Sequence, residues 1–560
     1  MEVVMKKFKK ALSAALALVL VTSLVACNTN SGDTKKTTEK PATESSEGGS
    51  SEGETKENDP ANDPVEIDLE KSVFSANLPD YMGNGTKLIY HTIGGTPEDL
   101  KLVNDEINKY TKEHMNVEVE LVFHGWDEYG SNLNTIINGG EAYDIAFGSS
   151  ITGVQQFANQ DLFLDIKTVI DKAPNLKALI SEDLWKGVTR SDGEIFGVPA
   201  YKDSAAAQYW VFDKKLVDAY DLDISDVVSM DDLGSKILDK IAASDVEMPA
   251  HLNKYPLYFD KNGINSMLFE YESMAAGVGV KFGTTKAENI YAAEDIVHKF
   301  QLLADWYNKG YINPDANTRD EKDPDSDAIF SAQGWDEAAS IWGQKRPAGV
   351  EVNRRLEPMF TSGTIQGSYL VVSRAAQNAE DAIKFIERIN VDQYLRNLYA
   401  YGIEGTHWNK TDKENVIVKT EQGASKYGVP AYSQAQFMNM YIAADVVNEE
   451  NAEQYPDLKI GDPILEKANA DQYRVDIHKM NQDAEASELL GFVFNPKNVE
   501  AEIAALDNII KKYQATLLTG AAGVDGLQGV LDQMHAEQES AGIQKVIDEA
   551  QSQIDAFLGK

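Results

Sequence analysis

The sequence predicts an α/β fold built around a parallel sheet. Three short stretches with strand character, at residues 87–92, 117–123 and 143–147, alternate with two stretches of helical periodicity at about 96–114 and 127–138. Strands that alternate with helices through short connections are typical of parallel sheets. The order of these five elements therefore indicates the fold class before any motif is considered.

Each element has a local signal of its own. The first helix should begin near Thr96, where a capping threonine precedes Pro97 at the first helical position and acids in the first turn. The second strand mostly alternates apolar and acidic residues, and the second helix should end at Gly139–Gly140, because glycine closes helices in the left-handed conformation. Ligands of parallel sheets bind at the carboxyl ends of the strands.

Residues 1–26 have the features of a secretory signal: four lysines between Lys6 and Lys10, an apolar run over 11–25 and small residues before Cys27. Leu24–Cys27 matches the bacterial lipobox, which implies that the cysteine carries diacylglycerol after cleavage. The alternative is an ordinary signal peptide beside a stray cysteine. Residues 28–64 contain no Val, Ile, Leu, Met or aromatic residue, so 27–64 should form a disordered tether.

Composition limits the remaining possibilities. The formal net charge is −38, and it becomes −41 once the signal, with four lysines and one glutamate, is removed. A field of this sign disfavours nucleic acids and anionic lipid headgroups as partners. Cys27 is the only cysteine, so no intramolecular disulfide can form. About 490 residues remain to fold, which suggests two or three domains.

Three loops follow the predicted strands, at residues 91–95, 124–126 and 148–150, and their glycines and polar groups suit a neutral ligand. Trp126 is the most specific candidate, because an indole can stack on a pyranose while its N–H bonds a hydroxyl. The alternative is a tryptophan that packs as core on the following helix. Ser149 and Ser150 are the other candidates for ligand contact in these loops.

Several segments carry a family resemblance. The chain resembles the family 1 extracellular solute-binding proteins, relatives of maltose-binding protein that feed ABC importers, at residues 139–147, 163–166 and 195–199. Residues 309–315 and 401–408 are similar to a lipoprotein subgroup of Gram-positive bacteria. That subgroup ends in an extra domain of unknown function, which residues 491–558 resemble.

The resemblance implies a two-lobed, periplasmic-binding-protein-like α/β fold with parallel-sheet lobes, a hinge, an interlobe cleft and a helical C-terminal extension. The expected parts are the signal peptide 1–26, the tether 27–64, lobe 1 at 65–200, lobe 2 at 201–375, a returning segment 376–490 and the extension 491–560. The implied function is a monomeric, lipid-anchored receptor on the extracellular face of the cell membrane. It would capture an oligosaccharide and deliver it to the permease subunits of an ABC importer, without catalysis.

Candidate cleft residues follow from the resemblance and from the aromatic and planar polar groups that sugars require. The first group lies where the family crosses between lobes: Tyr201, Lys202, Asp203, Gln208 and Trp210. The alternative is a hinge strand whose aromatic side chains pack inside the second lobe.

The second group is Trp335 and Trp342, in a polar, glycine-rich stretch that relatives often present to the ligand. A surface loop with buried anchors is the alternative. The third group is Glu404, His407 and Trp408, because Gly402 and Gly405 should form a tight turn that aims one of them into the cleft. Glu404 is the candidate chosen from this group.

Other functions remain open from the residues alone. A surface-anchored glycoside hydrolase or lyase is one, since 90 acidic residues place some pair of carboxylates at a catalytic separation. A sugar-sensing receptor subunit would share the anchor and the cleft. No catalytic residue, cofactor or metal is predicted, because the acids of Asp323–Asp327 lack the glycine and glutamate of a calcium loop. Amphipathic helices at 499–517 and 542–558 should pack on the lobes, since they lack a basic face for membranes.

Overall fold

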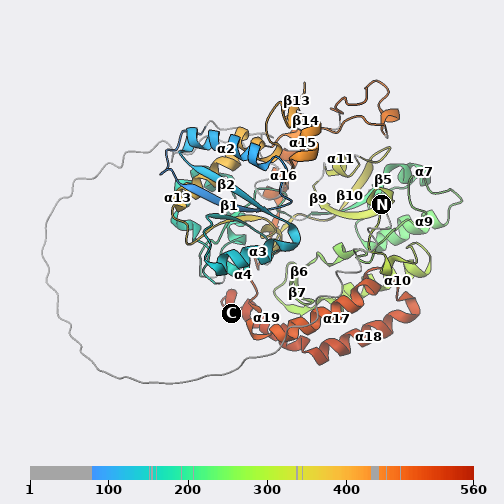
Figure 1. Cartoon of the computed structure of the whole chain (residues 1–560). Helices are drawn as coiled ribbons and strands as arrows, with labels where there is room; N and C mark the ends of the chain where they lie inside the picture. Colours follow the sequence, from blue (N-terminus) through green and yellow to red (C-terminus); the bar gives the residue numbers. More distant parts are fainter. Residues whose placement is uncertain are drawn as a thin grey trace, which may run out of the picture. The chain divides into compact units, whose positions relative to one another are not determined.

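The structure is a computed structural model that describes residues 78–560, except 151, 153, 154, 159, 191, 206, 336, 337, 344, 430–439, 450, 467 and 469 (Figure 1). The predicted signal, the tether and Cys27 lie outside the described residues. Within the described part, none of the helices combines the length and the apolar character needed to cross a bilayer.

A mixed five-stranded sheet forms the centre of lobe 1. Its strand order is β2-β1-β3-β12-β4, and the strands are β1 (Lys87–Ile93), β2 (Glu118–His124), β3 (Ile145–Gly148), β4 (Val198–Pro199) and β12 (Tyr369–Val372). As predicted, β1 is parallel to both β2 and β3. The helices that cover this sheet are α2 (Leu100–Met115), α3 (Trp126–Gly139), α13 (Ala379–Val391) and α14 (Gln393–Tyr401). The five elements predicted from local signals are therefore all present.

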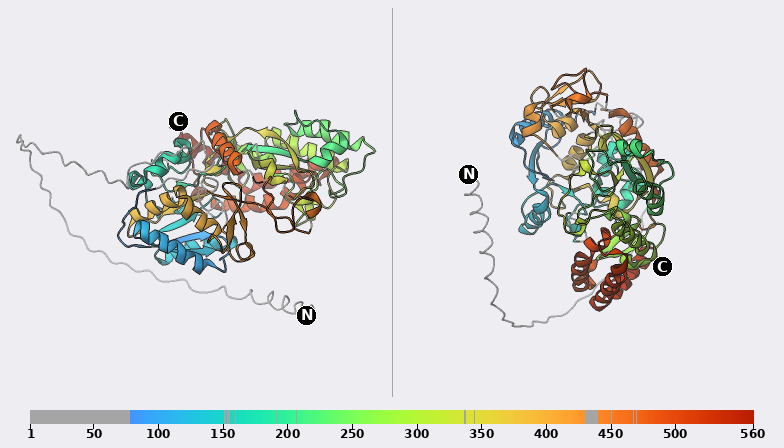
Figure 2. Two further views of the ribbon diagram at one scale, coloured as in Figure 1. Left: turned by 90° about the horizontal axis from the view of Figure 1, so that it is seen from above. Right: turned by 90° about the vertical axis from the view of Figure 1, so that its right-hand side faces the viewer.

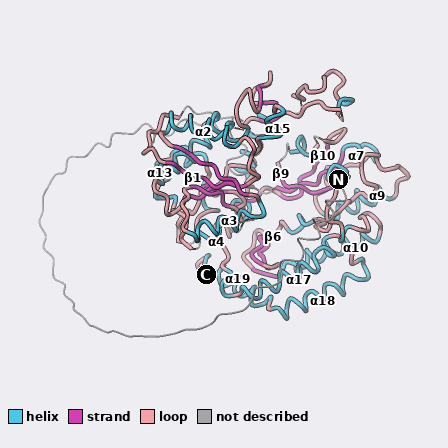
Figure 3. The backbone as a smooth tube through the Cα atoms, in the orientation of Figure 1, coloured by secondary structure: helices cyan, strands magenta, loops and turns pink. Residues whose placement is uncertain are grey.

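Helices cover both faces of this sheet. On one face, the Tyr90 ring of β1 packs against Phe385 of α13 and Tyr399 of α14, with ring centroids 6.4 Å apart in both pairs. On the other face, His91 stacks on His124 of β2, and α3 contributes Tyr129 to the same layer. Figure 3 shows these strands between the helices. Alternation of side chains along β1 thus explains why every apolar residue of the strand is buried or nearly so.

The boundary between the lobes differs from the expected one. Strand β12 falls inside the segment 201–375 that was expected to form lobe 2, but it pairs antiparallel with β3 and β4 of lobe 1. All four of its residues are buried. The chain therefore returns to lobe 1 before Tyr369, earlier than the predicted residue 376.

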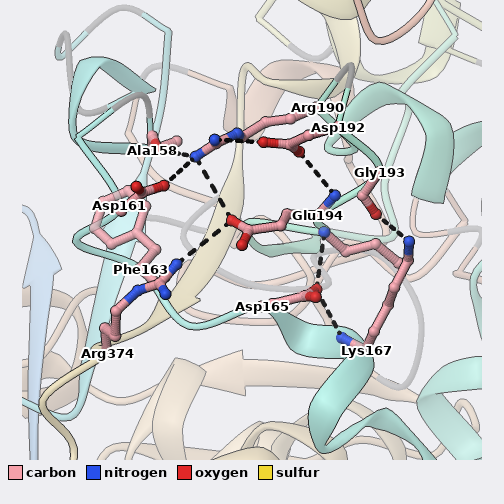
Figure 4. Close-up of polar contacts among 11 residues, drawn as sticks. Ala158, Asp161, Phe163, Asp165, Lys167, Arg190, Asp192, Gly193, Glu194 and Arg374 are labelled. Atoms are coloured by element: carbon pink, nitrogen blue, oxygen red, sulfur yellow. Dashed lines mark hydrogen bonds and ion pairs between the residues drawn. The ribbon is translucent and has the colours of Figure 1, made fainter. Parts of the chain in front are cut away.

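Ion pairs hold the loops beside the end of β12 (Figure 4). Arg190 contacts the carboxylates of Asp161 at 2.8 Å and Asp192 at 2.6 Å. Arg374, just after β12, lies 3.4 Å from the Glu194 carboxylate and donates to the Phe163 carbonyl. Because arginines neutralise these acids, we regard the cluster as a structural clamp on lobe 1.

Lobe 2 is organised by an antiparallel sheet of order β10-β5-β9, made of β5 (Ala207–Asp213), β9 (Ile329–Gly334) and β10 (Val350–Leu356). The three strands of this sheet therefore lack the parallel pairing that was expected for both lobes. Strand β5 matches the strand predicted at 205–212, and all seven of its residues are buried. Trp210 and Phe212 point into the lobe 2 core, which also contains Phe300 of α10 (Glu294–Asn308).

The C-terminal extension packs on lobe 2, as Figure 2 shows for the red helices. It consists of α17 (Glu500–Leu518), α18 (Gly523–Ala541) and α19 (Ile543–Phe557). Side chains such as Leu517 and Met534 belong to the lobe 2 core. Helix α19 packs on the sheet of β6 (Tyr271–Ala275), β7 (Val278–Lys281) and β8 (Ala287–Asn289). Both predicted helices are present, whereas α18, which contains three glycines, had no predicted counterpart.

The remaining elements are short, apart from α16. The helices are α4 (Gln155–Ala158), α5 (Pro174–Leu179), α6 (Glu182–Gly187), α7 (Lys214–Tyr220), α8 (Met230–Asp232), α9 (Asp239–Ala242), α11 (Ala339–Trp342), α12 (Ser362–Ile365), α15 (Glu421–Lys426) and α16 (Ala470–Asp483). The strands are β11 (Met359–Phe360), β13 (Trp408–Lys410), β14 (Val416–Lys419), β15 (Ile442–Ala443) and β16 (Glu485–Ala486).

Candidate functional site

A cavity opens at the carboxyl edge of the lobe 1 sheet, where parallel α/β sheets bind their ligands. At this edge β3 ends and the antiparallel β12 begins, and the Ser150 amide donates to the Gln366 carbonyl at 2.8 Å. Close packing here requires Gly148, because a Cβ on this residue would lie 2.1 Å from the Tyr369 ring. Ser150 and Gln366 both line the cavity, which has a volume of about 520 Å³.

The cavity combines aromatic rings with small polar groups. Its lining comes from both lobes and from the start of the extension: Ser150, Phe269, Tyr271, Glu272, Ser273, Met274, Gln333, Met359, Thr361, Ser362, Gly363, Thr364, Gln366, Gly367, Leu489, Phe492, Val493 and Phe494. Thr361 and Thr364 cap α12 reciprocally, each side-chain oxygen accepting from the other residue's amide at 3.1 Å. These rigid loops present hydroxyl and amide groups beside ring surfaces, an arrangement suited to a neutral polyhydroxyl ligand.

Glu272 supplies the only carboxylate among the lining residues that the structure describes. Its side chain accepts a hydrogen bond from the Ser487 hydroxyl. Burial raises the pKa of Glu272 from 4.5 to about 7, although the Ser487 hydrogen bond acts in the opposite direction. Near neutral pH this carboxyl group is therefore partly protonated, and it can donate as well as accept a hydrogen bond.

Replacing Glu272 with glutamine should change how stability depends on pH. The folded pKa lies above the unfolded one, so the stabilisation from protonated Glu272 is complete below about pH 4.5 and is lost as pH rises through about 7. The glutamine variant cannot titrate there. We therefore expect the free energy of unfolding of the variant, relative to that of the native chain, to rise by about 2 kcal/mol from pH 5 to pH 8. Urea unfolding at both pH values measures this difference, and parallel pH profiles would contradict it.

Comparison with known proteins identifies the family. The family model described as bacterial extracellular solute-binding protein matches residues 94–388. The chain belongs to this family. A second model, a domain of unknown function named DUF3502, matches residues 488–559 of this solute-binding protein, which is the segment that forms α17, α18 and α19. The resemblance stated from sequence motifs is thus confirmed at both ends of the folded region.

A similar sequence and two similar solved structures come from solute-binding proteins, and the solved structures support the two-lobed fold. A carbohydrate ABC transporter substrate-binding protein of Streptococcus pneumoniae serotype 4 is 25% identical over 478 residues, which cover 84% of this chain and 90% of the relative. The N-glycan transport solute binding protein NgtS of Streptococcus pneumoniae superposes with a TM-score of 0.69 at 23% identity, covering 85% of this chain and 99% of that one. Its complex with Man1GlcNAc gives 0.59 at 22% identity, with coverages of 85% and 100%.

The predicted loop residues of this solute-binding protein lie at the expected sheet edge. Trp126 begins α3, and its side chain is 38% exposed while its ring meets the Phe147 ring edge-on at 6.3 Å. Ser150 lines the cavity. Ser149 is fully buried, and its carbonyl accepts from the Thr152 hydroxyl at 2.9 Å. Trp126 and Ser150 thus remain accessible to a ligand, whereas Ser149 supports the loop.

The crossing segment is fixed by α16. The Tyr201 hydroxyl shares a hydrogen bond with His478 Nδ1, and Tyr201 is buried. Asn481 accepts from the Ala205 amide at 3.1 Å and donates to the Lys202 carbonyl at 2.6 Å. Lys202 and Asp203 form an ion pair of 2.8 Å with each other. These predicted binding residues therefore help to hold in place the chain that connects the lobes.

Two of the predicted residues, Trp210 and Gln208, lie on strand β5 and differ in whether their polar groups have hydrogen-bond partners. Trp210 is fully buried, and its indole N–H donates to the Val228 carbonyl at 3.2 Å, so it belongs to the lobe 2 core. Gln208 is also buried, but neither polar atom of its side chain has a hydrogen-bond partner among the described residues. Gln208 lies directly opposite Gln333, which lines the cavity. Gln208 itself does not line the cavity, and its amide is buried beside Gln333.

The other two predicted tryptophans of lobe 2, Trp335 and Trp342, lie on the face of its sheet opposite to Trp210. The Trp342 ring packs 5.8 Å from the Tyr209 ring, and Trp335 is buried in the same apolar cluster. Both pack in this cluster, and neither is among the described residues that line the cavity. Glu404 lines a different pocket, which shares no residue with the cavity.

Most of the cavity lining had not been predicted from the sequence. Phe269, Tyr271 and Glu272 come from the β6 region, and Phe492 and Phe494 come from the extension. One signal was available, since two of the five residues at 491–495 are phenylalanines. Among the described residues, no group of three or more His, Cys, Asp or Glu side chains is arranged to hold a metal ion.

Proposed function

We propose that this protein captures an oligosaccharide outside the cell and delivers it to the permease subunits of an ABC importer. The observation that carries the proposal is the chemistry of the cavity, in which aromatic side chains stand beside hydroxyl and amide groups and none of the described lining residues is basic. Sugars need ring surfaces for their C–H faces and planar polar groups for their hydroxyls. A neutral oligosaccharide matches this lining better than an anionic one.

The relatives support the same ligand class. One is named for carbohydrate ABC transport, and the NgtS structure with Man1GlcNAc is a sugar complex. We propose that Trp126 and Ser150, from the predicted set, contact the sugar together with Phe269, Glu272 and Gln333. Glu272 and Gln333 would bond hydroxyl groups, while Trp126 and Phe269 would stack on pyranose faces.

The proposed place of action is the outer surface of the cell membrane. Cys27 would carry the lipid, and residues 28–64, which lack large apolar side chains, would give the receptor a reach of about 30–40 Å from the bilayer. This reach lets a monomeric receptor collect ligand and dock on a permease beside it. Mass spectrometry of the mature N-terminus would identify the lipid, and an unmodified Cys27 would refute the anchor.

Binding without catalysis fits the cavity better than glycoside hydrolysis. Glycoside hydrolases of the common mechanisms use two carboxyl groups across the scissile bond. Among the described residues that line the cavity, Glu272 alone has a carboxyl group. Product analysis after long incubation with a bound oligosaccharide tests this directly, since intact sugar supports a receptor and cleaved sugar supports an enzyme.

Replacing Phe269 with alanine should weaken oligosaccharide binding roughly tenfold, because it removes a stacking surface at the cavity rim. The side chain is 46% exposed, so the fold should tolerate the change. Residues 58–560 form one compact unit, and this part of the chain is suitable for calorimetric titration against neutral oligosaccharides, Man1GlcNAc included.

A matched control is Leu102→Ala on α2, because Leu102 is also 46% exposed and lies outside the cavity lining. Its affinity should equal that of the native chain. Equal affinities for all three proteins would contradict the assignment of the cavity as the ligand site. Absence of binding to every oligosaccharide in the panel would contradict the proposed function itself.

A further inference from the structure

A second pocket lies on lobe 1, and none of its lining residues belongs to the cavity described above. Its volume is about 370 Å³, within the range of about 300–1,000 Å³ that is typical of small-molecule sites. The lining residues are Tyr110, Asp392, Gln393, Tyr394, Asn397, Leu398, Gly402, Ile403, Glu404, Trp408, Lys410 and Tyr441. Four of these twelve are Tyr or Trp, a high share for a pocket on the surface of one lobe.

Contacts within the lobe hold two of these rings together on one side. The Tyr110 and Tyr394 ring centroids are 5.0 Å apart with an interplanar angle of 40°. The Tyr110 hydroxyl donates to the Asp392 carboxylate, which also caps the start of α14. Tyr394 is nevertheless 54% exposed. An exposed ring that is already fixed in place can stack on a ligand with little further loss of conformational entropy.

The other aromatic pair is fixed as firmly. The indole N–H of Trp408 donates to the Gly402 carbonyl at 2.9 Å, and the Trp408 ring meets the Tyr441 ring at 5.5 Å and 63°. Trp408 is largely buried, so it forms part of the apolar lining of the pocket. The pocket thus combines an exposed tyrosine with a buried indole, both preorganised.

Polar groups complete the pocket. Glu404 and Lys410 are both exposed and face each other at 3.1 Å. An exposed ion pair contributes little to stability, so both groups can exchange this contact for a ligand. A carboxylate beside an ammonium group offers an acceptor and a donor for adjacent hydroxyls. Asp392 and Glu404 together disfavour an anionic sugar, and Lys410 disfavours a cation.

We propose that this pocket is a second carbohydrate site, which takes one neutral pyranose unit outside the transport cavity. The sugar ring stacks on Tyr394, and Glu404 and Lys410 bond its hydroxyl groups. Such a site allows the receptor to hold one end of a longer glycan on lobe 1, independently of the sugar bound in the cavity. The turn that carries Glu404 thus acquires a role, although not in the predicted cleft.

Saturation-transfer NMR with simple sugars tests this proposal. The probes are the methyl pyranosides of mannose, glucose and galactose and free N-acetylglucosamine, each at millimolar concentration, with the unit 58–560. The native protein and Phe269→Ala should both give transfer to at least one probe. Tyr394→Ala should weaken that binding roughly tenfold through loss of stacking. Glu404→Gln, made as a separate variant, should also weaken it, because the charged acceptor is removed.

The two alanine variants form a matched pair, because Phe269 and Tyr394 are similarly exposed aromatic residues at different sites. Circular dichroism confirms that each variant is folded. Transfer that is unchanged in both Tyr394→Ala and Glu404→Gln, or transfer lost in Phe269→Ala, would overturn the second site. So would the absence of transfer from every probe to the native protein, or competition by tetramethylammonium, which would indicate a cation site instead.

Discussion

Replacing Arg346 with methionine is expected to lower the free energy of unfolding by about 3–5 kcal/mol, because it leaves a buried carboxylate without its countercharge. The Arg346 guanidinium and the Asp213 carboxylate are both buried and lie 3.1 Å apart. Arg346 also donates to the carbonyls of Asp327 at 2.6 Å and Pro324 at 2.8 Å. The variant thus removes a charge partner and two further hydrogen bonds from the lobe 2 core.

Asp213 cannot readily find a substitute partner. Its carboxylate already caps α7 by accepting from the Lys215 amide at 2.9 Å, and it lies 3.0 Å from His251 Nε2. Neither contact supplies a permanent positive charge. Asp213 also ends β5, the strand that joins the crossing segment to lobe 2. Destabilisation should therefore appear as earlier unfolding of this lobe.

A surface pair in the same lobe provides the control. Arg319 pairs with Asp315 four residues earlier, and both side chains are at least 31% exposed. Arg319→Met should cost less than about 1 kcal/mol, because exposed ion pairs contribute little. Guanidinium unfolding followed by tryptophan fluorescence measures both variants. Similar losses of unfolding free energy for Arg346→Met and Arg319→Met would show that the buried pair contributes no more to stability than the exposed pair.

The parts of the fold that depend on local signals were predictable. The five elements of lobe 1 between Lys87 and Gly148 are all present, and α3 ends at the predicted glycine pair. The predicted start of the first helix near Thr96 was wrong, because α2 begins only at Leu100, after Asp99 and without a side-chain cap. Helices α17 and α19, whose apolar residues follow helical spacing, are present as predicted. Each signal operates within one element and needs no knowledge of what packs against it.

Long-range pairing was not predictable in this way. Strand β12 is a short run of buried residues, and nothing in such a run distinguishes a partner in lobe 1 from one in lobe 2. The cavity depends on pairing of the same kind, since Phe492 and Ser150 line it together although 342 positions separate them. Composition identifies residues able to bind a sugar but cannot say which of them meet.

The fate of two tryptophans shows why residue type alone does not identify a site. Trp126 follows Gly125 at the start of a helix, and one side of its indole stays open to solvent. Trp210 lies in β5, where every residue is buried, because lobe 2 covers one face of this strand and further apolar residues cover the other. Because both faces of β5 are covered, the position of a residue along the strand does not show whether its side chain is exposed.

Replacing Gly520 with alanine should cost about 2–5 kcal/mol, from a left-handed backbone and a collision with a neighbouring helix. Gly520 lies between α17 and α18 with φ of 69°. A Cβ at this position would lie 2.1 Å from the Leu303 carbonyl oxygen and 2.4 Å from its carbon. Leu303 belongs to α10, and its backbone cannot move without breaking helical hydrogen bonds.

The collision should have a functional consequence, because the extension builds part of the cavity. Leu489 and Phe492, which form one wall of the cavity, pack in the same apolar cluster as Leu506 of α17, so a shift of α17 away from α10 would displace this wall. Gly520→Ala should therefore lower both the melting temperature and the affinity for oligosaccharide. Gly526→Ala is the matched control, since this glycine lies inside α18 with no atom within 4 Å of its Cβ position. The free energy of unfolding of Gly526→Ala should rise by about 0.5–1 kcal/mol, because the unfolded backbone has less conformational entropy to lose. A Gly520→Ala variant that is stable and binds oligosaccharide fully would contradict the proposed dependence of the cavity on the extension.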